Sequence, residues 1–120
     1  EVTNLITTID DVGSYIDTTV VKAAIDVYGD LLYLTRSPIP YPKTRQGYVV
    51  YKEIGAYAYR KDFLLKYTKM EQTPLELIEG IEMLRVLENG YKVRAVETDH
   101  QPMSVDTLSD LIEVEKLMKK

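Results

Sequence analysis

The sequence has no cysteine and a single histidine, His100. Without cysteine, disulfides and thiolate chemistry are excluded. One histidine cannot build a multi-histidine zinc site, so a zinc centre would need a shell of carboxylates. A nucleophile–histidine pair would have to use His100, and no elbow-like motif surrounds it, although Ser104 is close in sequence. Zinc-based and serine-based hydrolysis are therefore not expected.

Long apolar runs and clusters of one charge are also missing. No stretch approaches the roughly 20 apolar residues of a transmembrane helix, and no signal peptide is recognisable. The net charge is −4 and the sequence pI about 5.0, which disfavours binding to nucleic acid or to an anionic membrane. We expect one soluble, cytoplasmic domain of 120 residues, and its first residue, Glu1 instead of Met, indicates an excised or processed piece.

Hydrophobic periodicity and turn residues predict a mixture of strands and helices. Strands are expected at 20–27, 31–35, 48–59 and 92–97, and helices at 61–67, 74–88 and 107–118. The second helix begins with Thr73, Pro74 and Glu76, a capping box with proline at the first helical position. Three prolines make 37–47 an extended loop.

This order of elements predicts an α/β fold. Residues 1–19 are interpreted as either a linker or a strand remnant. The last helix is expected to bury its apolar side, formed by Leu108, Leu111, Ile112 and Val114.

Two basic residues lie where an anion could bind. Arg36 ends an apolar strand, and a guanidinium there can grip a carboxylate or phosphate in a bidentate manner. Lys43, just beyond the prolines, adds a second positive charge. The alternatives are an arginine lying over Tyr33 or Tyr41 and a solvated loop lysine.

Asp106 directly precedes the last predicted helix. A carboxylate at this position either stands at the N-cap or N′ position of the helix or binds a hard cation such as Mg²⁺. Magnesium usually takes one or two protein carboxylates together with phosphates and water, and no partner for Asp106 is obvious in the sequence. Both interpretations stay open.

Glu53 and Tyr57 lie four residues apart on the third predicted strand, so they share a face, which Tyr59 also joins. A carboxylate and a phenol beside a glycine suit a polyol ligand, and the alternative is a half-exposed, tyrosine-rich strand. Glu82 follows the apolar stripe of its helix and is interpreted as a solvated charge within reach of Arg85. The residues alone name no reaction.

Four motifs follow one another from about residue 19 to the end of the chain. They read VVK at 20–22 with LYLTRSPIPYP at 32–42, GAYAYR at 55–60, TPLELIEGIEMLRVL at 73–87, and VDTLSDL at 105–111. In order and spacing they resemble the C-terminal half of the 3-deoxy-manno-octulosonate (KDO) cytidylyltransferases. Each motif alone is weak, but four in sequence are specific.

The resemblance implies the C-terminal part of a three-layer, Rossmann-like fold of the nucleotide-diphospho-sugar transferase type, with residues 20–120 as the sugar-binding and dimerisation half of a cytidylyltransferase domain. Its family makes CMP-sugars from CTP and an eight-carbon acid sugar, releases pyrophosphate, uses Mg²⁺ and forms homodimers. Carried onto this sequence, it implies Asp106 as a magnesium ligand and Arg36, Tyr57 and Glu82 as contacts to the acid sugar. Lys43 stands where the family often has a second arginine. We therefore predict that Arg36 and Asp106 converge on one pocket.

The sequence departs from the family pattern at two positions that resemble sugar-binding residues. Glu53 replaces a histidine and Met83 replaces a glutamine. An anionic Glu53 repels a substrate carboxylate and favours an amine or a hydroxyl. The expected substrate is therefore a relative of KDO, for example an amino-substituted one.

The family's nucleotide-binding loop and the partner aspartate for the metal are not found in the sequence. We expect that this chain alone does not turn over CTP. Two alternatives remain: a non-catalytic dimerisation module, and a cytidylyltransferase for a nonulosonate or a phosphonate.

Overall fold

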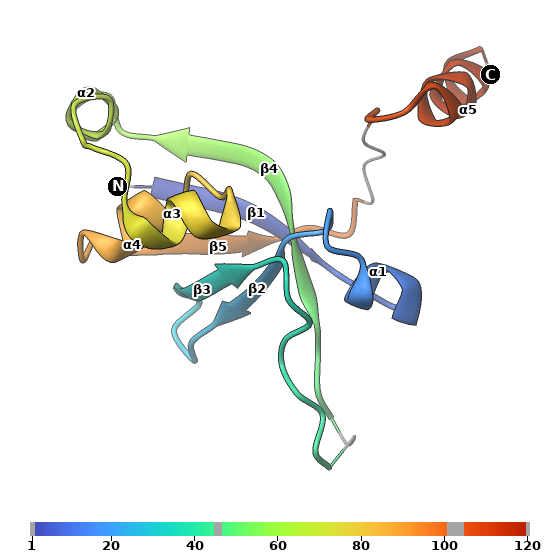
Figure 1. The fold of residues 1–120 in the computed structure, drawn as a ribbon, viewed down its shortest axis with the longest axis horizontal. Helices are drawn as coiled ribbons and strands as arrows, with labels where there is room; N and C mark the ends of the chain where they lie inside the picture. Colours follow the sequence, from blue (N-terminus) through green and yellow to red (C-terminus); the bar gives the residue numbers. More distant parts are fainter. Residues whose placement is uncertain (1, 45–46, 101–104, 120) are drawn as a thin grey trace.

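The computed structural model describes residues 2–44, 47–100 and 105–119, which form strands and short helices (Figure 1). The strands are β1 Val2–Thr8, β2 Lys22–Ile25, β3 Leu31–Thr35, β4 Tyr51–Tyr59 and β5 Val93–Glu97. The helices are α1 Val12–Ile16, α2 Lys61–Tyr67, α3 Pro74–Glu79, α4 Leu84–Glu88 and α5 Leu108–Met118. The predicted α/β class is confirmed, as are the hairpin of β2 and β3 and the helix at 61–67.

The five strands form one sheet in the order β3-β2-β4-β1-β5. β1 pairs parallel with β5 and antiparallel with β4, and the other neighbours are antiparallel. β1 is therefore flanked on both sides, and its Val2 and Ile6 are each 1% exposed. Within residues 1–19, for which a linker and a strand remnant were both considered, Val2–Thr8 is thus an interior strand of the sheet.

The two edges of the sheet are tied together at one end. Asp30, directly before β3, forms a bridge with Arg94 of β5, and the amide of Ala95 donates to the carbonyl of Gly29 at 2.8 Å. Arg94 Nε also lies 3.4 Å from Asp30 Oδ1. These contacts curl the sheet and leave less of the β5 edge open to pairing with another strand.

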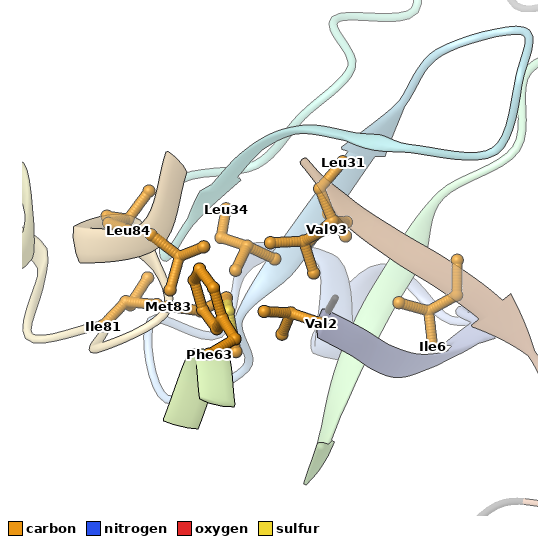
Figure 2. Close-up of a cluster of buried hydrophobic side chains, with 11 residues drawn as sticks. Val2, Ile6, Leu31, Leu34, Phe63, Ile81, Met83, Leu84 and Val93 are labelled. Carbon is orange, nitrogen blue, oxygen red and sulfur yellow. The ribbon is translucent and has the colours of Figure 1, made fainter. Parts of the chain in front are cut away.

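Apolar side chains gather on the sheet face that α2, α3 and α4 cover (Figure 2). Val2, Leu34 and Val93 of the strands belong to one cluster with Phe63 of α2 and Leu84 of α4. Each of these five is 3% exposed or less. Full burial of such a side chain stabilises a fold by about 1.5–3 kcal/mol, so this core fixes the helices against the sheet.

The helix predicted at 74–88 is two helices. α3 ends at Glu79, and Gly80 follows with a left-handed φ of 68°. A residue in this conformation terminates a helix, and glycine adopts it without the clash that a Cβ would cause. The chain therefore turns before α4 begins at Leu84, and this turn lets α4 face back toward α3.

α5 confirms the helix predicted near the C-terminus, with the Thr107 side chain accepting from the amide of Asp110 at its start. The prediction of a buried apolar side is wrong, because Leu108 is 73% exposed and none of the helix residues is buried. In Figure 1 the body of α5 stands apart from the sheet, which leaves its apolar side exposed. In the described ranges, no helix combines the length and the apolar character that a membrane crossing needs.

Candidate active site

A cavity of about 540 Å³ lies between the segment after α1, strand β4 and the start of α5. Its lining consists of Asp17, Thr19, Val20, Val21, Lys52, Glu53, Ile54, Gly55, Asp106 and Asp110. Two of the predicted site residues, Glu53 and Asp106, thus share one cavity although 53 positions separate them in the sequence. Four carboxylates and one lysine give the cavity a negative charge.

Glu53 is held by two neutral donors. The Tyr57 hydroxyl and, at 3.4 Å, the Asn4 side-chain amide both donate to Glu53 Oε1. Burial raises the pKa of the Glu53 carboxyl, and the hydrogen bonds from Tyr57 and Asn4 oppose this rise only in part. The hydrogen bond between their side chains confirms the predicted common face of Glu53 and Tyr57. On β1, Glu53 pairs with Ile6 and Tyr57 with Asn4, and the register shifts between these two pairs.

The tyrosines beside Glu53 form a ring cluster. Tyr57 and Tyr59 have ring centroids 6.3 Å apart. Burial and the negative charges of Glu53 and Glu82 raise the pKa of Tyr57 well above its usual value, and burial first of all raises that of Tyr59 to about 12. Both phenols therefore stay protonated near neutral pH and act as hydrogen-bond donors. Glu82 is exposed, and its negative charge makes a smaller contribution to both rises.

Arg36 uses its guanidinium on backbone carbonyls. Nε donates to the carbonyl of Glu79 at 2.6 Å, Nη1 to that of Thr18 at 3.1 Å and Nη2 to that of Gly80 at 3.2 Å. The alternative of an arginine lying over Tyr33 or Tyr41 is not what these contacts describe. Arg36 ties the end of α3 to the segment that lines the cavity, and the guanidinium keeps N–H groups beyond these three.

The prediction that Arg36 and Asp106 converge on one pocket is wrong for the cavity described above. Arg36 does not line the cavity that Asp106 lines. Its Nη1 donates to the carbonyl of Thr18, which stands in the sequence between the lining residues Asp17 and Thr19. A strand-end arginine was expected to point at a ligand, but the nearby C-terminus of α3 presents carbonyls that satisfy it first.

The prediction that Met83 stands at a sugar-binding position is wrong. Its side chain is 1% exposed and belongs to the apolar core, so it has no surface to offer a substrate. Met83 lies three residues after Gly80 and points into the core, where an apolar side chain is favoured. Lys43 lies exposed on the proline loop, away from the residues that line the cavity.

Asp106 is exposed and lies directly before the N-cap residue of α5. Its amide donates to Asp110 Oδ2 at 3.2 Å, while Thr107, one residue on, is the helix cap. Asp106 therefore stands at the N′ position of the helix, one of the two positions that the helix interpretation allowed. In the described part of the chain, the Asp106 carboxylate makes no hydrogen bond or ion pair, whereas hydrogen bonds to the cap lower the pKa of Asp110.

The comparison with known sequences decides the family. The family described as "Cytidylyltransferase" matches residues 1–98, which is most of the chain. The chain belongs to the cytidylyltransferase family.

Similar proteins narrow the kind of cytidylyltransferase that this chain resembles. The 3-deoxy-manno-octulosonate cytidylyltransferase of Solibacter usitatus is 44% identical over 112 residues, 92% of this chain and 44% of that protein. The protein of the same name from Acaryochloris marina is 38% identical over the whole chain and 49% of its own length. The solved structure of CMP:2-keto-3-deoxy-manno-octonic acid synthetase complexed with CTP superposes with a TM-score of 0.91 at 33% identity, covering 98% of this chain and 48% of that one. The chain spans about half the length of the curated relatives it matches.

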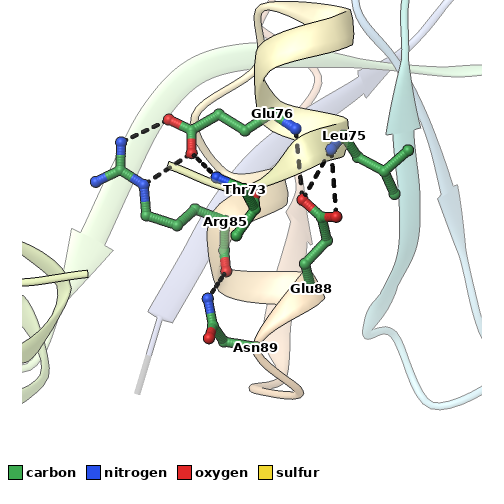
Figure 3. A network of polar contacts seen from close by, with 6 residues as sticks. All are labelled: Thr73, Leu75, Glu76, Arg85, Glu88 and Asn89. Atoms are coloured by element: carbon green, nitrogen blue, oxygen red, sulfur yellow. Dashed lines mark hydrogen bonds and ion pairs between the residues drawn. The ribbon is translucent and has the colours of Figure 1, made fainter. Parts of the chain in front are cut away.

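In this member of the cytidylyltransferase family, the motif at 73–87 folds into a buried ion pair (Figure 3). Arg85 donates to both oxygens of Glu76, with Nε 2.8 Å from Oε2 and Nη2 2.5 Å from Oε1. Glu76 also accepts from the amide of Thr73 at 3.2 Å, and the Glu88 carboxylate accepts from the amide of Leu75. The expected pairing of Arg85 with Glu82 is thus replaced by a pairing with Glu76.

Sequence reasoning missed three polar residues around the site. Asn4 is completely buried beside Glu53, and Lys52 lines the cavity. Lys22, also fully buried, donates through Nζ to the carbonyls of Asp17 at 2.5 Å and Arg36 at 2.8 Å, and burial lowers its pKa. An asparagine or lysine at an inward position of a strand is the one signal in the sequence that could have found them, since such groups are rarely buried without a partner.

Proposed function

We propose that this chain is the acid-sugar-binding portion of a cytidylyltransferase that joins CTP to KDO or a related eight-carbon acid sugar. The products are the CMP-sugar and pyrophosphate. The observation that carries the proposal is the TM-score of 0.91 over 98% of the chain to a synthetase of this name complexed with CTP. CTP is made and used in the cytoplasm, which is where the proposal places the protein.

The reaction needs positioning and charge neutralisation more than covalent help from the protein. The anomeric hydroxyl of the sugar forms a bond to the α-phosphorus of CTP while the bond from that phosphorus to the pyrophosphate oxygen breaks, and the hydroxyl proton is lost. Glu53 and Tyr57 lie on one face of β4 and supply an acceptor and a donor for sugar hydroxyls, and the proposal adds the exposed Glu82 as a further acceptor. Arg36 and Lys43, which do not line the cavity, are the proposed source of positive charge for the sugar carboxylate, Arg36 through the N–H groups that its three carbonyl contacts leave over.

Mg²⁺ belongs to the proposal through Asp106. The Asp106 carboxylate lines the cavity without a side-chain partner in the described ranges, so it fits the role of one metal ligand. Asp110 beside it is occupied with the helix cap. The described residues contain no group of three or more potential ligands, and magnesium commonly completes its shell with phosphates and water. When bound, the metal neutralises charge on the triphosphate.

A homodimer is also part of the proposal. The apolar side of α5 is exposed, with Ile112 46% and Leu108 73% accessible, and a partner subunit would cover such a side. Sedimentation equilibrium of the purified chain measures this directly, and a monomer at all concentrations contradicts it.

The function is tested by pyrophosphate release from CTP, KDO and Mg²⁺. We expect no release by the purified 120-residue chain, because it carries no recognisable nucleotide-binding loop. The complete product of the gene that encodes it should release pyrophosphate, and Asp106→Asn in that product should lower kcat at least about a hundredfold, as loss of one charge-stabilising group does. A complete product that converts neither KDO nor its analogues refutes the proposal.

A further inference from the structure

We propose that Lys22 is a positioning residue that holds Arg36 where its guanidinium can bind the carboxylate of the acid sugar. This inference rests on the proposed function and goes beyond it, because it assigns a role to a fully buried lysine that acts only through another residue. It follows from the carbonyls that the Lys22 ammonium binds, from the way Arg36 is held at the same place and from the cost of burying the charge.

Lys22 joins the segment that enters β2 to the segment that leaves β3. Its Nζ donates to the carbonyl of Asp17 at 2.5 Å and to that of Arg36 at 2.8 Å. Asp17 is the C-terminal cap of α1, where carbonyls lack a partner within the helix. Arg36 directly follows Thr35, which Lys22 faces across the β2–β3 pair. The ammonium therefore fixes the backbone from which the Arg36 side chain departs.

The Arg36 side chain ties the same place to α3. Its Nη1 donates to the carbonyl of Thr18, while Nε and Nη2 donate to those of Glu79 and Gly80 at the end of the helix. A guanidinium has five N–H donors, so these three bonds leave one N–H on each Nη for a carboxylate. The three carbonyls set the direction of these two groups, and Thr18 is the neighbour of the residue whose carbonyl the ammonium holds. A shift of this segment therefore turns the guanidinium.

Stability alone does not explain a lysine at this position. The side chain is completely buried, and neither of the two ion pairs among the described residues includes it. Burial lowers the pKa of the Lys22 ammonium, because the charged form is the one that loses most when water is removed. An apolar side chain of similar length avoids this cost, and such replacements of buried charges are often neutral. The two carbonyls that the charge holds give it a purpose.

The first test compares two guanidinium groups in one molecule. NMR measures the exchange with water of the Nε–H proton of Arg36 and of Arg85, whose Nε donates to Glu76 at 2.8 Å. In Lys22→Met the Arg36 proton should exchange at least about tenfold faster, the loss of one hydrogen bond from a charged group, and the Arg85 proton should keep its rate. Lys69→Met, which removes an exposed lysine, should change neither proton.

The second test restores the ammonium. The chain has no cysteine, so Lys22→Cys, unfolded in urea, can be alkylated with 2-bromoethylamine at this position alone and then refolded. The product carries an ammonium on a side chain as long as that of lysine, and it should return the Arg36 proton to its original exchange rate. In the unaltered chain, NMR should detect couplings across hydrogen bonds from Lys22 Nζ to the carbonyl carbons of Asp17 and Arg36. This measurement needs no variant, so it decides the proposal even if Lys22→Met does not fold.

The consequence for function is measured in the complete gene product. Lys22→Met should raise KM for the acid sugar at least about tenfold and leave kcat and KM for CTP unchanged, because a grip on the carboxylate is the same in ground state and transition state. A loss of general stability would instead reduce the amount of active enzyme, which lowers the apparent kcat and leaves KM alone.

Contrary results separate this inference from the proposed function. An unchanged Arg36 proton, or equal acceleration of the Arg36 and Arg85 protons, overturns the positioning role. So does an alkylated chain in which the Arg36 proton still exchanges fast, the absence of both couplings, or an unchanged KM for the acid sugar. Failure of the complete gene product to form any CMP-sugar refutes the proposed function instead, and the exchange rates and couplings can still be read, since they need neither substrate nor turnover.

Discussion

Glu76 and Glu53 are both withdrawn from solvent, yet their surroundings act on their charges in opposite directions. Glu76 is 3% exposed and receives two donors from Arg85, and the hydrogen bond from this cation holds the pKa of its carboxyl below the usual range. Glu53 receives only neutral donors, from Tyr57 and Asn4, and burial raises its pKa. One carboxylate is neutralised within the fold, and the other is not.

The difference separates a structural role from a binding role. The Glu76 ion pair links α3 to α4 and packs under the Tyr67 ring, which lies 4.8 Å from the Arg85 guanidinium carbon. Glu53 lines a cavity and keeps an oxygen without a partner among the described residues. Groups whose ionisation is disfavoured in a cleft are frequent at functional sites, because a ligand completes their environment.

The largest effect is expected from breaking the Glu76 pair. Arg85→Met leaves the buried Glu76 carboxylate without its cation and should lower the free energy of unfolding by about 3–5 kcal/mol. Urea denaturation followed by circular dichroism measures this loss. Arg60→Met, which removes an exposed arginine with no ion pair among the described contacts, should change stability by less than about 0.5 kcal/mol.

A double replacement compares the stability that the Glu76–Arg85 pair provides with that of two apolar side chains in its place. Glu76→Leu together with Arg85→Leu removes both charges, and stability should return to within about 1–2 kcal/mol of the original, since apolar side chains often replace buried pairs without loss. If Arg85→Met alone costs no more than Arg60→Met, the pair is not structural and the contrast with Glu53 disappears.

A smaller effect is expected at the turn that brings Arg85 back to Glu76. Gly80 has a φ of 68°, and a Cβ added there would meet Arg36 Nη2 at an ordinary contact distance of 3.6 Å. The cost of Gly80→Ala is therefore one of backbone conformation, about 1–2 kcal/mol in the same urea experiment. Gly80→Asn should cost less, because asparagine tolerates the left-handed region. Equal costs for both variants would indicate crowding at Arg36 instead.

Local signals in the sequence predicted much of the fold. The hairpin of β2 and β3 and the cap at Thr107 depend on neighbouring residues, so propensity and turn chemistry identified them. β1 was not predicted as a strand with defined bounds. Its buried residues Asn4 and Thr7 are polar and interrupt the apolar alternation that would have indicated it. The end of α3 at Gly80 was not predicted either, since a single glycine in a helical pattern does not reveal its φ.

The candidate site was predicted as far as strand parity and motif resemblance allow. Parity placed Glu53 and Tyr57 on one face, and the structure confirms it. Arg36 donates to backbone carbonyls, and Met83 is buried, because α3 and α4 pack against the sheet. This tertiary packing cannot be read from local sequence. Glu76 and Glu53 look alike in sequence, and only their neighbours in space distinguish them.

The smallest effect, and the sharpest contrast, is the response of stability to pH. The pKa of Glu76 is lowered on folding, so its contribution to stability is present above the unfolded value near 4.5 and is lost as pH falls below it. The pKa of Glu53 is raised on folding, so the folded state binds the proton more tightly and stability falls as pH rises from 4.5 through the raised value.

Glu53→Gln should therefore remove a loss of stability above pH 4.5. At pH 7 the variant should be as stable as the original chain or more stable by up to about 1 kcal/mol, because an unpaired buried charge is gone and the new amide can donate to Asn4 Oδ1. Unfolding in urea at pH 4 and at pH 7 gives the comparison. The difference between variant and original should be near zero at pH 4 and favour the variant at pH 7, whereas a Glu53→Gln chain that is less stable at pH 7 than at pH 4, relative to the original, would mean that the ionised carboxylate already has a partner inside the fold.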